Sequence, residues 1–379
     1  MSRTILDIHV LQTVPPSNLN RDDTGSPKTA YFGGTQRARV SSQAWKRATR
    51  LNFDQVLDDS QLGVRTKRVA EILSSRLQDL VGGKDELPEE EATKLASQAL
   101  TAAGYKLVKP KANKKDDEKG PKHEESAYLL FLSNAQYDAL ASLALEAHSA
   151  GNAIDKKAAK AAANEKHSVG IALFGRMIAD DPGLNVDAAC QVAHALSVHP
   201  VETEFDYFTA VDDRKYKESE TGAGMIGTVE FNSATLYRYA ALDINRLREN
   251  LGDNQATIDA AATFLRAFVT SMPTGKQNTF ANRTVPDAIL VHLREDQPIN
   301  LVGAFEEPVQ TNEGRVKAAA DALAKHVGYV EETGFTKPPV ETWNVAVGPN
   351  AEGIQGLGIN SSFGELVTNV ETTIASRLE

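Results

Sequence analysis

The chain opens on a regular alternation of apolar and polar residues. In the segment TILDIHVLQ, Leu6, Ile8 and Val10 fall on one side, and Asp7 and His9 fall on the other. A period of two is typical of a β-strand with one buried face. We therefore predict a first strand here whose polar face is turned to solvent.

The pattern changes to a helical period further along the chain. Over residues 66–80 the apolar positions fall on one helical stripe, formed by Val69, Ile72, Leu73, Leu77 and Leu80. Similar patterns follow over 89–104 and 133–151, separated by a charged stretch, 109–125, that is too polar to bury. We predict a mostly helical inserted lobe over residues 58–168.

Strand patterns return after this lobe. SVGIALFGRM (168–177) and EFDYFTAVDD (204–213) have the pattern of buried strands, and DAACQVAHALSVH (187–199) between them has that of a helix carrying Cys190. A strand, two helices and a strand then follow in FNSATLYRYAALDI, INRLRENL, QATIDAAATFLRAFVTSM and PDAILVHL. The order of elements predicts an α+β fold, a ferredoxin-like sheet interrupted by the helical insertion.

Composition limits the class of protein. With 379 residues, 41% hydrophobic content and a mean hydropathy of -0.34, the chain can bury a large core. No apolar run approaches the roughly 20 residues that span a bilayer, and the first residues lack a signal-peptide pattern. One cysteine excludes internal disulfides. We expect a cytoplasmic protein with no membrane partner.

Positive charge is concentrated in one short stretch, although the formal net charge is -10. The segment RARVSSQAWKRATR contains Arg37, Arg39, Lys46, Arg47 and Arg50. From residue 24 to residue 53 the chain has no Asp or Glu, and Lys28 adds a further cation. A segment of one sign attracts the opposite charge, and the obvious polyanion is a nucleic acid. We call residues 28–50 the basic corner; the alternative is a solvated face paired to acids elsewhere.

Local geometry supports this interpretation of the basic corner. Arg37 and Arg39 share a face if their segment is extended. Ser41 or Ser42 can cap a helix that begins near Gln43. On that helix Lys46 and Arg50 lie one turn apart, on the same face. We predict a strand, a turn and a cationic helix, whose N-terminal amides also favour phosphate.

Catalytic chemistry has weak support in the sequence. The pairs Asp22–Asp23 and Asp212–Asp213 could bind Mg²⁺ in a nuclease, but such pairs in Gly/Pro-rich loops commonly form turns. His194 and His199 lack zinc spacing, and PTGKQN (273–278) lacks the glycine-rich run of a phosphate loop. We expect no catalytic residue, no metal site and no cofactor.

Six motifs occur in an order that points to a known family. They are SNLNRDD, FGGTQRARVSSQAWKRATR, VGIALFGRM, FDYFTAVDD, IGTVEFNSATLYRYA and GKQNTFA. Together they resemble the backbone (CasC-type) subunit of the type I-E CRISPR surveillance complex, Cascade. The resemblance covers nearly the whole chain and is weakest over 81–150 and near the C-terminus.

The resemblance implies a shape like a right hand and a role in antiviral defence. It implies a ferredoxin-like (RRM-like) palm over 1–57, 169–203 and 231–379, helical fingers over 58–168, and a thumb hairpin over 204–230. Several copies would line up along one guide RNA beside other Cascade subunits and present the guide for pairing with target DNA. Such a subunit is not catalytic. The alternative is a related backbone subunit with metal-dependent endoribonuclease activity on target RNA.

The resemblance also implies contact residues. Matched motif positions and the chemistry of the basic corner together give the predicted RNA-binding set: Asn20, Arg21, Lys28, Arg37, Arg39, Ser41, Gln43, Lys46, Arg47, Arg50, Met177, Met225 and Thr228. Met177 and Thr228 match positions that contact a kinked guide, although from its sequence alone Met177 would be core filler. Met225 lies in the glycine-rich ETGAGMIGT, the expected thumb tip.

A lysine-bearing helix of the fingers is the implied DNA contact. In DKKAAKAAANEKH the matching residues are Lys156, Lys157 and Lys160. Ala163 stands where another lysine is expected, with Lys166 as its candidate substitute. The alternative is that these lysines only make an alanine-rich helix soluble.

Overall fold

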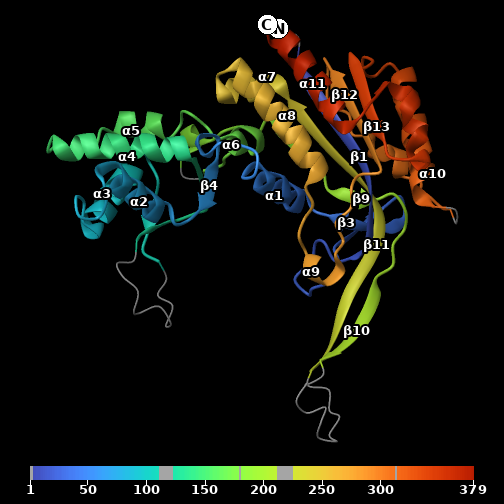
Figure 1. Ribbon diagram of the computed structural model, residues 1–379, viewed down its shortest axis with the longest axis horizontal. Coiled ribbons are helices and arrows are strands. Elements are labelled where there is room, and N and C mark those ends of the chain that lie inside the picture. Colours follow the sequence, from blue (N-terminus) through green and yellow to red (C-terminus); the bar gives the residue numbers. More distant parts are fainter. Residues whose placement is uncertain (1–2, 111–122, 179–180, 211–224, 312–313) are drawn as a thin grey trace, which may run out of the picture. The chain divides into compact units, whose positions relative to one another are not determined.

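The computed structural model describes residues 3–110, 123–178, 181–210, 225–311 and 314–379 (Figure 1). The chain divides into two compact units. Unit 1 comprises Met1–Asn52, Cys190–Asn245 and Ile258–Glu379, and unit 2 comprises Phe53–Ala189 and Arg246–Thr257. Across the described ranges, every helix is too short or too polar to cross a membrane.

Unit 1 is built on a mixed sheet that has ten strands in the described part of the chain. Its order is β14-β13-β12-β1-β11-β9-β3-β2, with β8 and β10 also paired to β11. The strands are β1 (Ile5–Ser17), β2 (Thr29–Phe32), β3 (Thr35–Val40), β8 (Cys190–Val192), β9 (Ala195–Ser197), β10 (Glu204–Ala210), β11 (Met225–Asp243), β12 (Ala288–Arg294), β13 (Glu341–Ala346) and β14 (Ile359–Asn360). Only β13 and β14 pair in parallel among these described ladders.

Apolar clusters cover both faces of this sheet. On one face Leu11 and Tyr237 pack with Leu323 of α10, and on the other Val14 and Leu236 pack with Trp45 of α1. The helices with residues in unit 1 are α1 (Ser42–Phe53), α7 (Ile244–Leu251), α8 (Asn254–Thr270), α9 (Gln277–Phe280), α10 (Arg315–Glu332) and α11 (Phe363–Leu378), with 3-10 helices η4 (Leu301–Phe305) and η5 (Pro349–Leu357). The core therefore lies in two layers, one on either side of the strands.

Unit 2 is mostly helical. Its helices are α2 (Val69–Val81), α3 (Glu89–Ala102), α4 (Asn134–Ser149), α5 (Lys156–Ala162) and α6 (Val169–Phe174), with 3-10 helices η1 (Asp59–Gln61) and η2 (Pro182–Leu184). Two short ladders join β4 (Gly63–Thr66) to β7 (Leu130–Ser133) and β5 (Leu107–Val108) to β6 (Glu125–Ser126). The three helices predicted from apolar stripes are confirmed as α2, α3 and α4. Most of the charged stretch between the last two lies outside the described residues.

The first strand is confirmed, but the prediction that its polar face meets solvent is wrong. Asp7 and His9 are both fully buried, because β1 lies between β11 and β12. Arg294 Nε and the Tyr239 hydroxyl donate to the two oxygens of Asp7, at 3.0 and 2.7 Å. A buried carboxylate is tolerable when it is paired and hydrogen-bonded in this way.

Two further sequence predictions are corrected. The segment predicted as a strand over 168–177 forms helix α6, which Ser168 caps through Ile171 N and Gly175 ends with a φ of 76°. The segment predicted as a helix over 187–199 forms β8 and β9, so Cys190 lies on a strand opposite Leu242 of β11. Pairing with the long central strand overrides the helix propensity of its alanines.

Candidate nucleic-acid interface

The strand and helix predicted for the basic corner are confirmed as β3 and α1, but the two arginines of β3 have different environments. Arg37 is fully buried. Its guanidinium donates to the carbonyls of Ser197 and Phe305, both at 2.9 Å, and to Thr35 Oγ1 at 2.9 Å. We therefore correct the prediction that Arg37 contacts RNA: its donors hold the β2–β3 hairpin to the rest of unit 1.

The turn of this hairpin also needs glycine. Gly33 has a φ of 57°, and a Cβ there would lie 1.7 Å from the carbonyl oxygen of Glu306. Only a residue without a side chain permits this close approach. The turn and Arg37 together place β3 firmly against the segment that follows η4.

Arg39 and Lys28 form the accessible part of the strand region. Both are partly exposed. Arg39 Nε donates to the carbonyl of Thr29 at 3.0 Å, and Arg39 N donates to the carbonyl of Lys28 at 2.9 Å. The two residues therefore lie side by side on neighbouring chain segments, and each is partly exposed.

The predicted contacts Asn20 and Ser41 are occupied in joining the loop to the helix. Asn20 Oδ1 accepts from Ser41 N at 2.9 Å, and Ser41 Oγ accepts from Ala44 N at 3.3 Å. Of the two serines that the sequence offers as caps, Ser41 is thus the N-cap of α1, and it is 6% exposed. Arg21 is exposed in the same loop.

Asp22 acts through its own backbone, as the turn interpretation predicts. Its Oδ1 accepts from Thr24 N at 2.9 Å, from Ser26 N at 3.0 Å and from Thr24 Oγ1 at 2.7 Å. The hydroxyl of Thr24 and these amides hold the pKa of Asp22 below its usual value. The second acidic pair, Asp212 and Asp213, lies outside the described residues.

Helix α1 presents its cations on one side and its anchor on the other. Gln43 and Arg47 are exposed, and Lys46 and Arg50 are partly exposed. Trp45 is 1% exposed, and the guanidinium carbon of Arg238 lies 3.8 Å from the centre of its ring. Arg238 is a residue that the sequence analysis missed: it is buried and acts through Trp45 to hold the cationic helix.

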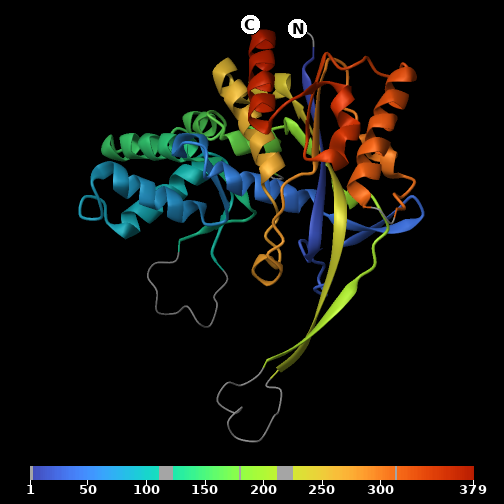
Figure 2. The same ribbon diagram turned by 45° about the vertical axis from the view of Figure 1, so that its right-hand side comes forward.

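Within the predicted hairpin, 204–230, strands β10 and β11 pair antiparallel from Glu204–Phe231 to Ala210–Met225, and β11 continues beyond the neighbouring strands of the sheet (Figure 2). Thr228 is exposed and lies opposite Tyr207. Tyr207 and Phe205 are 66% and 67% exposed, so β10 is not the buried strand that its sequence indicates. Met225 begins β11, but its side chain and the expected thumb tip lie outside the described residues.

Met177 of unit 2 is exposed, which excludes the core-filler alternative. It is 83% exposed, while its neighbours Arg176 and Ile178 are buried. Arg176 Nε donates to the carbonyl of Leu184 at 2.9 Å, and Ile178 N donates to Asn185 Oδ1 at 2.5 Å. The backbone on both sides of Met177 is thereby fixed with its side chain in solvent.

The three lysines of the predicted DNA-binding helix are exposed on α5. Lys160 pairs with Asp181 at 2.8 Å, so part of its charge is neutralised. Ala163 is fully buried in the unit 2 core, which explains why no lysine stands there. Lys166 is exposed, with a φ of 51°.

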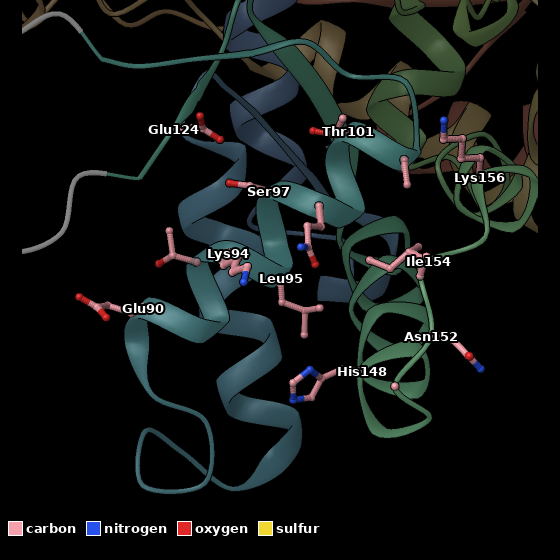
Figure 3. A pocket seen from close by; sticks show the side chains of 15 residues that line it. Glu90, Lys94, Leu95, Ser97, Thr101, Glu124, His148, Asn152, Ile154 and Lys156 are labelled. Carbon is pink, nitrogen blue, oxygen red and sulfur yellow. The ribbon is translucent and has the colours of Figure 1, made fainter.

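A cavity of ≈ 980 Å³ lies beside the first of these lysines (Figure 3). Lys94 and Lys156 contribute to its lining, but so do Glu90 and Glu124. The rest of the lining is made of His148 and of uncharged polar and apolar residues. The cavity therefore lacks the single-sign field that would mark it as an extension of a DNA-binding surface.

The geometry agrees with comparisons of this chain with known proteins. The family model described as CT1975-like protein matches residues 6–369. The chain belongs to this family. No curated protein matches the chain.

Two solved structures extend the similarity of this CT1975-like protein. One chain, of a "CRISPR RNA-guided surveillance complex, pre-nicking", is 33% identical with a TM-score of 0.82, covering 98% of this chain and 100% of that chain. Another, of a "CRISPR RNA-guided surveillance complex", is 29% identical with a TM-score of 0.73, covering 97% and 99%. The CT1975-like chain thus has the same fold over almost its whole length.

Proposed function

We propose that this protein is the guide-RNA-binding backbone subunit of a CRISPR surveillance complex of type I-E. The similarity over 98% of the chain to a subunit of an RNA-guided complex carries the proposal. The exposed cations of the basic corner give it a chemical basis, since Lys and Arg contacts to phosphate hold a nucleic acid without reading its sequence. A guide-holding subunit must accept every spacer sequence.

The proposed architecture assigns a task to each part. The strand order β12-β1-β11-β9 supports a ferredoxin-like palm, and the β10–β11 hairpin supports a thumb. Exposed Met177 and exposed Thr228 would each contact the kinked guide, where an apolar side chain can lie beside an unstacked base. The lysines of α5 would guide duplex DNA, with Lys156 and Lys157 contributing more than the paired Lys160.

The proposed subunit is not an enzyme, and it works in the cytoplasm as one of several copies in a ribonucleoprotein with other Cascade subunits. The endoribonuclease alternative would need an ionised aspartate that can reach a metal ion and RNA. Asp22 instead accepts from Thr24 and Ser26, so nothing observed on the described residues favours the alternative.

Purification from the host with sequencing of the bound RNA tests the role. A pool of uniform repeat-spacer RNAs is the expected result, and recovery of the folded protein without RNA would contradict the proposal. Incubation with complementary RNA and Mg²⁺ distinguishes the proposed function from the endoribonuclease alternative, because the proposed subunit should leave that RNA intact.

A further inference from the structure

The irregular segment between β8 and β9, which both pair antiparallel with β11, places a histidine beside the cations of the basic corner. In the pairing of β3 with β9, Arg39 lies opposite Leu196 and Val40 lies opposite Ala195. His194 lies two residues before Leu196 and is exposed. His194 directly precedes Ala195, the partner of Val40, so it lies at the end of the β3–β9 ladder, one residue beyond the Val40–Ala195 pair and close to Arg39.

Lys28 completes a group from three separate chain segments. It lies beside Arg39 through the hydrogen bond from Arg39 N to its carbonyl. Partial burial lowers the pKa of His194, and the charges of Arg39 and Lys28 lower it further. The imidazole is therefore within electrostatic range of both cations, and its protonation in the free protein is opposed by them.

Lys28, Arg39 and His194 are accessible to solvent, whereas Arg37, on the same face of β3, is covered by another segment. Arg37, two residues earlier in β3, is covered by the segment that contains Phe305 and Glu306. Arg39 and Lys28 are partly exposed, and His194 is exposed. A ligand can therefore reach all three groups from solvent.

We propose that His194 is a further guide-RNA contact, which binds one phosphate jointly with Arg39 and Lys28 when its imidazole is protonated. The inference rests on the proposed function. A phosphate among the three groups replaces their mutual repulsion by attraction, so the bound state favours the imidazolium. Guide binding at this position then takes up a proton.

The sign of the pH dependence follows from this proton uptake. RNA raises the pKa of His194 from its lowered value, so affinity increases as the pH falls through the interval between the free and bound values. Well above that interval the imidazole is neutral in both states and adds little. Below it the protein makes one more ionic contact with the RNA.

The test measures the binding of a fluorescently labelled single-stranded RNA of mixed sequence to the full chain at pH about 8 and about 5.5, where most unperturbed histidines change charge. We expect wild-type affinity to increase by roughly threefold to tenfold more than that of His194→Gln, since one linked proton changes affinity by at most about tenfold per pH unit. His194→Arg should bind tightly at both pH values. At the lower pH the wild-type salt slope should be steeper than that of His194→Gln by about 0.7.

His148→Gln is the matched control, because His148 is an exposed histidine of unit 2 that lies 3.6 Å from Glu91. It should retain the wild-type pH dependence. Identical pH dependence in wild type and His194→Gln, with RNA bound by both, would overturn this inference alone. Failure of the wild-type protein to bind RNA at either pH would instead overturn the proposed function, and this inference with it.

Discussion

At the scale of single residues, two arginines only two positions apart in β3 have different environments, since Arg37 is buried and Arg39 is partly exposed. The sequence predicts both as RNA contacts because both are cations on one face of a strand. The difference arises because Arg37 donates to the carbonyl of Phe305, which is 268 residues away along the chain. Local pattern predicts the strand, a serine cap at Ser41 or Ser42 and the cationic helix, whereas burial of one guanidinium depends on packing between distant segments.

Replacement of Arg37 tests this difference. Arg37→Met should lower the free energy of unfolding by roughly 3 kcal/mol, because it leaves the carbonyls of Ser197 and Phe305 without donors and each costs about 1–3 kcal/mol. Arg39→Met should cost about 1 kcal/mol or less, the value of one hydrogen bond. Urea unfolding followed by tryptophan fluorescence measures both, since Trp45 and Trp343 are buried in unit 1. If Arg37→Met left stability unchanged and reduced the slope of log K for RNA against log salt, Arg37 would be an RNA contact after all.

The cations of α1 should act on RNA of any sequence alike. Lys46→Ala with Arg50→Ala removes two predicted phosphate contacts, and each contact to a single strand contributes about -0.7 to the slope of log K against log salt. The slope should therefore become shallower by roughly 1.4. Lys317→Ala with Lys325→Ala, exposed on α10 of the same unit, makes the same change in net charge. If both double variants gave the same slope, the effect would be one of net charge alone.

At the scale of elements, β1 shows what an alternating pattern leaves undetermined. The pattern correctly predicts a strand. Its polar face would be expected to meet solvent, because the pattern does not show which polar groups of neighbouring strands pair with it. Here Asp7 meets Arg294 of β12 and Tyr239 of β11, which are 287 and 232 residues away. The same limit applies to β8 and β9, whose conformation depends on β11 rather than on their own alanine content.

The buried histidines of the central strands predict acid sensitivity. Burial lowers the pKa of His292 from 6.5 to about 3 and that of His9 well below 6.5. As the pH falls below about 6.5, the unfolded chain therefore binds protons that the folded chain does not, and stability decreases. Asp7 acts in the opposite direction, because burial raises its pKa to about 6 and its protonation favours the folded chain.

The histidine contribution can be isolated in unit 1. Between pH about 6.5 and about 4, the unfolded wild-type chain should bind a proton at His292 that the folded chain does not. His292→Gln removes this proton, so the slope of the free energy of unfolding against pH should become shallower by up to about 1.4 kcal/mol per pH unit. Urea unfolding followed by tryptophan fluorescence at several pH values gives this slope. His148→Gln should keep the wild-type slope, and a His292→Gln slope equal to the wild-type slope would show that His292 is not held neutral.

Helix α5 gives a prediction about DNA rather than RNA. Replacing Lys156, Lys157 and Lys160 by Ala should leave RNA-bound assemblies intact and slow their association with duplex DNA, because surface charge acts mainly on encounter. Stability should change little, since the Lys160–Asp181 pair lies at the surface and exposed ion pairs contribute weakly.

The control for α5 lies in the same unit. Lys67, Lys84 and Lys106 are also exposed, and their joint replacement by Ala changes the net charge equally. Stopped-flow association with labelled duplex DNA compares the two triple variants. Equal slowing in both would mean that α5 has no special position, and loss of the RNA-bound assembly in the first would place α5 at a subunit or guide contact.

At the scale of the whole molecule, the proposed function requires copies of the chain to act together along one RNA. The β10–β11 ladder supports this, because its exposed Tyr207 and Thr228 face solvent on a pair of strands that continues past the sheet (Figure 2). The sequence predicts the hairpin and the family similarity supports its use. Regular spacing of subunits on a guide is a property of the assembly, so neither observation on one chain can supply it.

Replacing residues 211–224 by a short Gly/Ser linker between Ala210 and Met225 tests the hairpin. The two cores of unit 1 lie elsewhere, so the melting temperature should change little, while RNA-dependent association of subunits should fail. Ribonuclease should then digest the guide without regular protected intervals. The same linker in place of residues 111–122 of unit 2 is the control and should leave the protected intervals unchanged.

The intact protein should also leave a chemical pattern on its guide. If each subunit displaces bases where Thr228 or Met177 contacts the guide, those bases lose their stacking partners and their pairing edges become accessible. Base-modifying reagents should therefore react with the bound guide at regular intervals, and the reactive bases should stay unpaired after target DNA is added. Replacing the two contact residues, Met177→Ser with Thr228→Gly, should weaken the periodic reactivity while Lys46 and Arg50 still hold the backbone. Uniform reactivity along the wild-type guide would contradict base displacement. It would leave phosphate binding by the basic corner unaffected.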